Sequence, residues 1–305
     1  MTARDSQTPP SSPTQGPLAR KSRRRWRRRL AMLALVAIAG VVAILAGDWL
    51  TLSPRDADER RIAFERTQRR WLARMGMALP GAPDLADFSQ RLAAHGLKEG
   101  APILMRIFKR EFELELWMAR DGVFHHFATY PICRWSGRLG PKLKTGDRQA
   151  PEGFYEVSRS SLNPNSRWHR SFNLGFPNVY DRSLGRTGSF LMVHGGCASV
   201  GCYAMTNAQI DEIWRLINAA FDQGQTSFQV QAYPFRMTPE RLANYQDHPD
   251  AAFWRDLQAG NALFETTRLP PQVNVCKGRY LFSPGNSPSQ SVGISERCPQ
   301  TSAKN

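Results

Sequence analysis

The most informative stretch of this chain runs from residue 194 to residue 205 and reads His194-Gly195-Gly196-Cys197-Ala198-Ser199-Val200-Gly201-Cys202-Tyr203-Ala204-Met205. It places one imidazole and two thiols in a short glycine-rich segment. Because a cysteine attacks as its thiolate, a nucleophilic cysteine needs a base or a positive neighbour close by. The pattern therefore indicates that Cys202 is a nucleophile and His194 its base. Glycines such as Gly201 also permit the tight backbone approach that an oxyanion-binding loop needs.

Regular elements are predicted on both sides of this stretch. Residues 189–193 are mostly apolar, which predicts a strand that ends at the histidine. Thr206 and Gln209 have the spacing of a capping box, and apolar residues then recur at helical intervals up to Gly224, so a helix is predicted here. We expect Cys202 to lie just before this helix, where backbone N–H groups and the helix dipole favour a thiolate.

Upstream of this stretch, the spacing of apolar residues is typical of strands. Residues 103–108, 112–116 and 123–132 are rich in β-branched and aromatic residues with turn residues between them, which predicts an antiparallel meander. Another strand is predicted over residues 228–233. Helices are predicted over residues 55–77, near residues 88–97, from Pro239, and from Pro249 to Leu257.

The N-terminal segment predicts a membrane anchor. Residues 1–47 hold nine basic residues and one acidic residue, so about half of the net charge of +15 lies here. Leu30–Gly47 is an unbroken run of apolar and small residues, about the shortest length that spans a bilayer. Basic residues directly before it predict a cytoplasmic N-terminus and an exported remainder, hence an inner-membrane protein with its catalytic domain in the periplasm.

This segment has two other interpretations. A cleavable signal peptide would release the chain into the periplasm, but the apolar run is longer than a usual signal core. Nucleic-acid binding by the arginines is the weakest interpretation, because no aromatic platform or further basic stripe follows them.

Five cysteines agree with export, since an odd number allows one free thiol and up to two disulfides. Cys202 is the one expected to be free. Cys276 can pair with Cys298, and Cys133 with Cys197, but the connectivity does not follow from the sequence.

The motif has a family resemblance. Ser199-Val200-Gly201-Cys202, following His194-Gly195, resembles the active-site signature of the L,D-transpeptidases (YkuD domain), most closely the YafK-like branch. Upstream motifs similar to that branch are Tyr130-Pro131-Ile132-Cys133, Gly140-Pro141-Lys142 and Ala150-Pro151-Glu152-Gly153-Phe154-Tyr155. The resemblance covers roughly residues 101–235. It implies a mainly β fold, the YkuD-type β-sandwich with attached helices, preceded here by a single N-terminal transmembrane helix.

The resemblance also implies a function. Cys202 matches the family's nucleophile, His194 its base, and Ser199 and Gly201 the supporting motif positions. The implied reaction is acyl transfer or hydrolysis at the peptide stem of peptidoglycan, and the branch includes hydrolases that release a peptidoglycan-bound lipoprotein. The alternative is an inactive peptidoglycan-binding scaffold whose cysteines only form disulfides.

Two positions depart from the family pattern. Val200 replaces the usual histidine, and Ala204 replaces the arginine that binds a substrate carboxylate. Basic residues that can take over this contact, if they are not simply solvated, are Lys142, Lys144, Arg148 and Arg134. We therefore favour hydrolytic release over cross-linking.

No cofactor and no metal are expected. His194, Cys197 and Cys202 do not have the spacing of a zinc site, and no second ligand pair accompanies them. His125 and His126 are adjacent on a predicted strand, so they face opposite sides and are assigned no role.

Six segments are expected along the chain, from composition and pattern together. They are a disordered basic cytoplasmic tail over 1–29, the anchor over 30–47, a helical stalk over 48–100, the catalytic domain over 101–235, a helical C-terminal extension over 236–282 and a mobile tail over 283–305.

Overall fold

The computed structural model describes residues 26–27, 30–40, 53–289 and 293–298. The chain divides into two units, Met1–Ser53 and Pro54–Asn305. Residues 30–40 of the first unit are helical, whereas 41–47 of the predicted anchor and most of the predicted basic tail lie outside the described residues. Within the described ranges, no helix combines the length and apolar character needed to span a bilayer. The anchor therefore stays a prediction.

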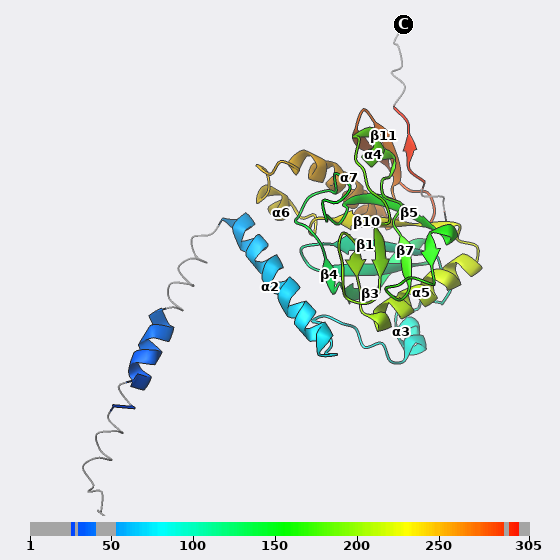
Figure 1. Cartoon of the computed structure of the whole chain (residues 1–305). Coiled ribbons are helices and arrows are strands. Elements are labelled where there is room, and N and C mark those ends of the chain that lie inside the picture. Colours follow the sequence, from blue (N-terminus) through cyan, green and yellow to red (C-terminus); the bar gives the residue numbers. More distant parts are fainter. Residues whose placement is uncertain (1–25, 28–29, 41–52, 290–292, 299–305) are drawn as a thin grey trace, which may run out of the picture. The chain divides into compact units, whose positions relative to one another are not determined.

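A five-stranded mixed sheet forms the base of the second unit (Figure 1), in the order β3-β2-β1-β10-β5. Its strands are β1 Ile103–Phe108, β2 Glu113–Arg120, β3 Val123–Pro131, β5 Gly153–Ser158 and β10 Ser227–Tyr233. The first three pair antiparallel in sequence order, which confirms the predicted meander. β10 pairs parallel to β1 and antiparallel to β5.

A second mixed sheet carries the predicted site residues, in the order β4-β9-β8-β7-β6. Its strands are β4 Arg134–Trp135, β9 Tyr203–Ala204, β8 Met192–His194, β7 Ser171–Asn173 and β6 Leu162–Asn163. The strand predicted over 189–193 is thus shorter and begins later. The physical reason is Phe190, whose φ of 57° breaks the extended conformation just before the strand.

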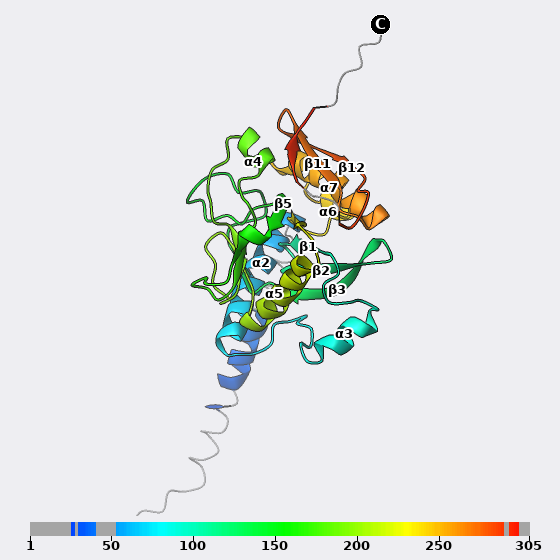
Figure 2. The ribbon, with the colours of Figure 1, turned by 90° about the vertical axis from the view of Figure 1, so that its right-hand side faces the viewer.

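Both sheets and one helix share the main core. The side chains of the second sheet that face this core come from neighbouring positions on successive strands: Trp135, Tyr203, Val193 and Phe172. Helix α5, Asn207–Asp222, packs against the same core, and its capping box between Thr206 and Gln209 is present as predicted. Figure 2 shows α5 in the foreground, running obliquely beside β1 and β2. The result is an arrangement of two mixed sheets with attached helices.

The remaining helices are α2 Pro54–Arg74, α3 Phe88–Ala94, the short 3₁₀ turn η1 Arg159–Ser161, α4 Val179–Ser183, α6 Pro239–Ala243 and α7 Ala251–Thr267. α2 was expected to be a stalk, but it packs on the domain. Its buried Asp58 lies 2.6 Å from Arg110 and 2.8 Å from Arg241 in ion pairs. These partners are far away in the sequence, so no local pattern reveals the contact.

The C-terminal segments also differ from expectation. Strands β11 Gln272–Cys276 and β12 Arg279–Ser283 form a hairpin in the segment expected to be helical, and β13 Ser295–Glu296 pairs with β11 in the expected tail. The reason is the turn Lys277-Gly278, where both residues have positive φ as a two-residue hairpin turn requires.

Candidate active site

The loop between His194 and Cys202 is unusually short. β8 and β9 are parallel neighbours, and parallel strands normally need a connection of about a dozen residues or more, whereas residues 195–202 suffice here. Gly196 and Cys197 have φ values of 81° and 51°, and Gly201 has a φ of 104°. These left-handed conformations let the chain double back, so that β8 ends and β9 begins beside each other.

The strand register places the predicted base and nucleophile on neighbouring strand segments. His194 pairs with Ala204, and Cys202 lies in the bend directly before β9. Because side chains alternate along a strand, His194 and Ala204 share the face opposite to that of Val193 and Tyr203. The backbone N–H of Met192 donates to Cys202 Sγ at 3.4 Å, which fixes the sulfur beside β8.

His194 is arranged as a neutral base. Its Nδ1 donates to the Gly195 carbonyl at 2.6 Å, which leaves Nε2 with the free lone pair. Only 4% of the residue is exposed, and this burial lowers the pKa of the imidazole below its ordinary 6.5. The ring of Trp168 lies beside it, with centroids 6.1 Å apart. The resting imidazole is therefore uncharged, and its Nε2 can accept the thiol proton during the attack.

Cys202 is the chain's one free cysteine and is half-buried. Burial raises the pKa of its thiol above the ordinary 9.0, while the Met192 N–H and the charge of Lys142 act in the opposite direction. No hydrogen bond joins the thiol to His194 among the contacts of the described residues. Both pKa shifts therefore favour a resting pair of neutral thiol and neutral imidazole.

Ser199 holds the backbone of Cys202. Its hydroxyl accepts from Cys202 N at 2.9 Å and donates to Cys202 O at 2.6 Å, and Ser136 donates to the Ser199 carbonyl at 2.9 Å. The Cys202 N–H is thus already occupied and is not free to donate to an oxyanion. The Gly201 N–H has no acceptor within the described ranges, and it is the better candidate for that role.

Cys202 does not directly precede the helix whose dipole was expected to favour its thiolate. α5 begins only after β9, and Thr206 caps its N3 amide through a 3.3 Å bond from Gln209 N. Two residues of β9 must first pair with β4 and β8, so Cys202 is carried away from the helix start. The positive neighbour of the sulfur is Lys142 instead.

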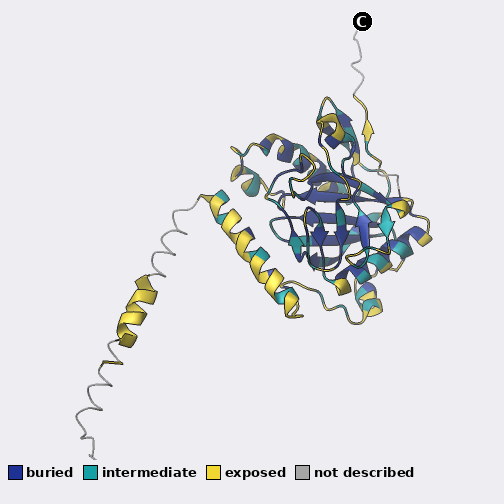
Figure 3. Cartoon of the chain, viewed as in Figure 1, coloured by how far each residue is buried: buried dark blue, intermediate teal, exposed yellow. Residues whose placement is uncertain are grey.

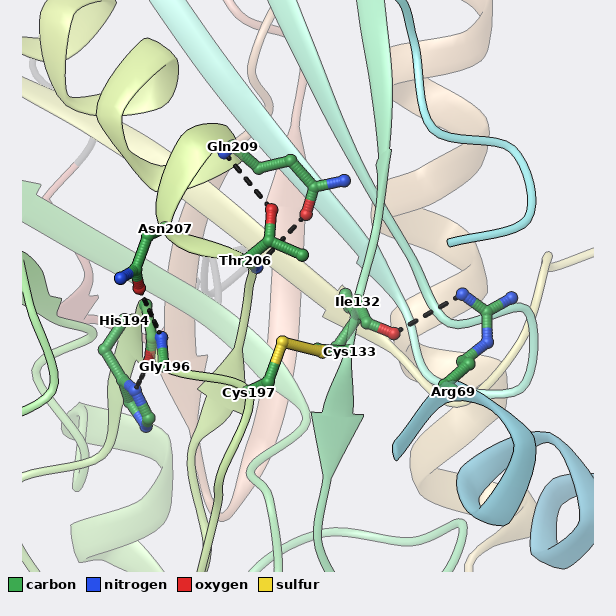
Figure 4. The surroundings of a disulfide bond; sticks show 10 residues. Arg69, Ile132, Cys133, His194, Gly196, Cys197, Thr206, Asn207 and Gln209 are labelled. Carbon is green, nitrogen blue, oxygen red and sulfur yellow. Dashed lines mark hydrogen bonds between the residues drawn. A yellow bond between two sulfur atoms is a disulfide. The ribbon is translucent and has the colours of Figure 1, made fainter. Parts of the chain in front are cut away.

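A disulfide anchors the loop from behind (Figure 4). Cys133 and Cys197 are bonded, as are Cys276 and Cys298, so both predicted pairings are confirmed. Cys197 N donates to the Met205 carbonyl at 3.2 Å, and the Asn207 side chain accepts from Gly196 N at 2.9 Å. The loop is therefore held by β3's end on one side and by the start of α5 on the other.

Of the basic residues considered as carboxylate contacts, Lys142 is the one whose charge acts at the site. Its ammonium group lies 2.5 Å from Asp147 and donates to the Lys144 carbonyl at 3.0 Å, and only 5% of the residue is exposed. Lys144 and Arg148 are exposed, and Arg134 lies opposite Ala204 across the β4–β9 pair. The sequence indicated Lys142 as one of four candidate substrate contacts but did not reveal its effect on the thiol.

A buried ion pair positions the loop that carries Lys142. Glu152 and Lys109 lie 2.9 Å apart with no exposed side-chain surface. Glu152 also accepts from Gly140 N at 2.8 Å and from the Trp254 indole at 2.8 Å. The motif glutamate therefore fixes the start of the Gly140-Pro141-Lys142 turn.

Lys142 and Asp147 are expected to change the thiol's reactivity in opposite directions. Lys142→Met removes a positive neighbour, so the pKa of Cys202 should rise and alkylation by iodoacetamide at fixed pH should slow, by up to about tenfold for one pKa unit. Asp147→Asn leaves the ammonium uncompensated and should speed alkylation. Equal rates in all three proteins would contradict this electrostatic link.

Within the described part of the chain, no three His, Cys, Asp or Glu side chains gather in an arrangement that could hold a metal ion.

The chain is similar to several known proteins. The sequence profile of the YkuD family, described as the L,D-transpeptidase catalytic domain, matches residues 114–255. The chain is 43% identical over 209 residues to an Escherichia coli (strain K12) protein named "Putative L,D-transpeptidase YafK", covering 68% of this chain and 82% of that protein.

Two solved structures are also similar. The helical cell shape determining protein Pgp2 of Campylobacter jejuni is 20% identical, with a TM-score of 0.36 over 58% of this chain and 63% of that chain. Bd1075 of Bdellovibrio bacteriovorus is 15% identical, with a TM-score of 0.32 over 57% of this chain and 76% of that chain. The chain thus spans less than two thirds of the Pgp2 structure.

Proposed function

Because the chain belongs to the L,D-transpeptidase family of YkuD domains, in its YafK-like branch, we propose that it is a cysteine acyltransferase or amidohydrolase acting on the peptide stem of peptidoglycan. One observation carries the proposal. The free, half-buried Cys202 thiol accepts a hydrogen bond from Met192 N, and two residues further along β8 lies His194, whose Nε2 has no hydrogen-bond partner among the described residues. The other four cysteines are in disulfides and cannot act as nucleophiles.

In the first step, His194 Nε2 takes the thiol proton of Cys202 as Sγ attacks the carbonyl carbon of the diamino acid in the stem. A C–S bond forms and the carbonyl electrons move onto oxygen. The Gly201 N–H donates to this oxyanion, a contribution of roughly 3 kcal/mol for one donor of this kind. The Ser199 contacts hold Cys202 still during the attack.

In the second step, the C–N bond breaks and the leaving amine takes the proton from the His194 imidazolium, which leaves a thioester on Cys202. A second nucleophile then attacks the thioester, and His194 removes its proton. The thiolate departs and is reprotonated. An amine gives a new cross-link or attachment, whereas water gives hydrolysis.

The neutral resting pair sets the expected pH dependence. Below the pKa of His194 the ring is an imidazolium and cannot accept the thiol proton, so kcat/KM should fall on the acid side, below pH 6.5. An alkaline fall should begin only where the thiol loses its proton to solvent, because the leaving amine then has no imidazolium proton to take, and the raised pKa of Cys202 places this fall above the ordinary 9.0. The check is a pH–rate profile on a muropeptide. A bell with its alkaline limb near neutrality would instead indicate a resting thiolate–imidazolium pair.

We favour hydrolysis over cross-linking. Ala204 is fully buried where the family carries its carboxylate-binding arginine, so a charge-assisted contact typically worth about 1.5–3 kcal/mol is missing. Such a loss lowers the affinity for a free stem peptide as cross-linking substrate roughly 10- to 150-fold, whereas attack by water needs no such contact. Release of a peptide or lipoprotein attached to peptidoglycan fits this chemistry best.

The test compares two substrates for the purified full chain, with Cys202→Ala as the control for non-enzymatic change. On peptidoglycan carrying a bound lipoprotein, mass spectrometry should find released lipoprotein and stems shortened at the attachment point. On plain stem tetrapeptides, new cross-links between diamino acids should be rare. Abundant cross-links without any lipoprotein release would establish the transpeptidase outcome instead.

We also propose an inner-membrane location with the catalytic domain in the periplasm, supported by the basic residues before the apolar run Leu30–Gly47. Alkaline phosphatase fused after Asn305 should then be active in cells. An inactive fusion would contradict export, and a soluble mature chain starting near Asp48 would replace the anchor by a signal peptide.

A further inference from the structure

Helix α2 has two chemically different faces. The inner face is bound to the body of the unit: Asp58 and Ile62 are 4% and 5% exposed, and Arg66 donates to the Gly137 carbonyl at 3.0 Å. Arg69, also 5% exposed, pairs with Glu65 at 2.9 Å and contacts the Phe112 ring. The helix is therefore fixed in rotation, and its opposite side is held away from the body.

The opposite side combines apolar and basic side chains. Phe64, Trp71 and Met75 are 65%, 56% and 61% exposed, although a core usually takes up such residues. At 100° per residue, the three fall within a narrow stripe along the helix. Figure 3 shows that most of this helix is exposed. We define the outer face of α2 as this stripe and the exposed arginines on its two sides: Arg60, Arg61, Arg70 and Arg74.

Positive charge predominates on the outer face. Its four arginines take part in no recorded ion pair of the described residues, unlike Arg69 on the inner face, and Asp56 is the exposed acidic residue on the same side. Single exposed apolar residues need no explanation, but three aligned beside four arginines and a net positive charge do. Aromatic and sulfur-containing side chains flanked by arginines are typical of a helix that lies in the interface of an anionic membrane.

The position of α2 in the chain favours the same partner. Residues 48–53 alone separate Pro54 from the apolar run that ends at Gly47. Even fully extended, such a connection reaches only about 20 Å, so a run that enters a bilayer keeps the start of α2 near its surface. We propose that the outer face of α2 lies on an anionic lipid surface. Because Asp58 and Arg66 bind α2 to the body, this contact orients the whole unit, with its Cys202 site, relative to the membrane.

The experiment measures how near the outer face comes to lipid in the full chain. A fluorophore is attached at Gln68→Cys, on the exposed side of α2, in a Cys202→Ser background that removes the other free thiol. The matched probe is at the exposed position Ser160→Cys. Vesicles of phosphatidylcholine, with or without phosphatidylglycerol, contain lipids with nitroxide headgroups that quench fluorescence at short range.

We expect strong quenching at position 68 in vesicles that contain phosphatidylglycerol and little at position 160. Phe64→Ser with Trp71→Ser should abolish the difference, whereas the exposed residue Leu184, changed to Ser, should not. Changing the four arginines to Gln should lower the equilibrium constant for docking on the anionic membrane by about fivefold for each charge removed. The matched charge control changes four exposed basic residues elsewhere to Gln: Lys98, Arg182, Arg255 and Arg297.

Several results would overturn the proposal. They are equal quenching at positions 68 and 160, quenching that ignores the anionic lipid, or variants of the outer face that behave like their controls. Concentration-dependent shielding of position 68 in detergent would assign the face to a second copy of the chain. Circular dichroism melts of every variant show whether a loss of quenching reflects unfolding. The readout needs no turnover, so it stands or fails separately from the proposed activity.

Discussion

Cys202→Ala is expected to abolish turnover, by a factor on the order of 10⁴ or more, while the protein stays folded. The substitution removes the free thiol and its two weak contacts, the Met192 N–H···S bond of 3.4 Å and the S–H···O bond of 3.7 Å to the Phe190 carbonyl, so the free energy of unfolding should change by about 1 kcal/mol or less. Muropeptide turnover followed by mass spectrometry and a urea titration measure the two quantities.

Ser199→Ala is the matched control for this result. It keeps the sulfur but removes both hydroxyl contacts to the Cys202 backbone, so activity should fall partially rather than vanish. Full activity in Cys202→Ala, with loss of activity in Cys197→Ala, would place the nucleophile at the other thiol of the motif.

The second large effect is expected from removing the disulfide behind the catalytic loop. Cys133 and Cys197 are separated by 64 residues, and closing a loop of this length stabilises the folded state by about 4 kcal/mol in the chain-entropy account. The double variant Cys133→Ser, Cys197→Ser should therefore unfold at clearly lower urea concentration. Its kcat should also fall, because Cys197 holds the loop that joins His194 to Cys202.

The second disulfide provides the control. Cys276 and Cys298 are separated by 22 residues and link a C-terminal strand to the segment beyond β13, with an expected contribution of about 3 kcal/mol. Changing both to Ser should lower stability and leave kcat near the wild-type value under conditions where the protein is folded. An equal fall of kcat in both double variants would show that the first disulfide has no specific effect on the site.

The local patterns in the sequence predicted the elements that local physics determines. The meander has its three strands because apolar and β-branched runs are separated by turn residues, and α5 starts at Asn207 because Thr206 and Gln209 cap it. Lys277-Gly278 is also a local turn signal, and it argues against the helical extension expected over residues 236–282.

What the sequence did not predict depends on contacts between distant residues. α2 packs on the body because Asp58 meets Arg110 and Arg241, and Lys142 reaches the site because Glu152 and Lys109 hold its turn. The thiol was expected to be acidified by a helix, but two residues of β9 intervene and burial raises its pKa. β8 has three residues and β9 has two, which is too few to show the alternation of apolar and polar residues that predicts a strand.

The most direct test of the proposed nucleophile is covalent trapping. The full chain is incubated with a carbapenem, whose strained carbonyl acylates reactive thiols, and the protein is analysed by intact mass and peptide mapping. The account predicts one adduct per chain, located at Cys202 and absent from Cys202→Ala. A chain that turns over peptidoglycan stems but carries no adduct at Cys202, or carries it at another residue, would contradict the account.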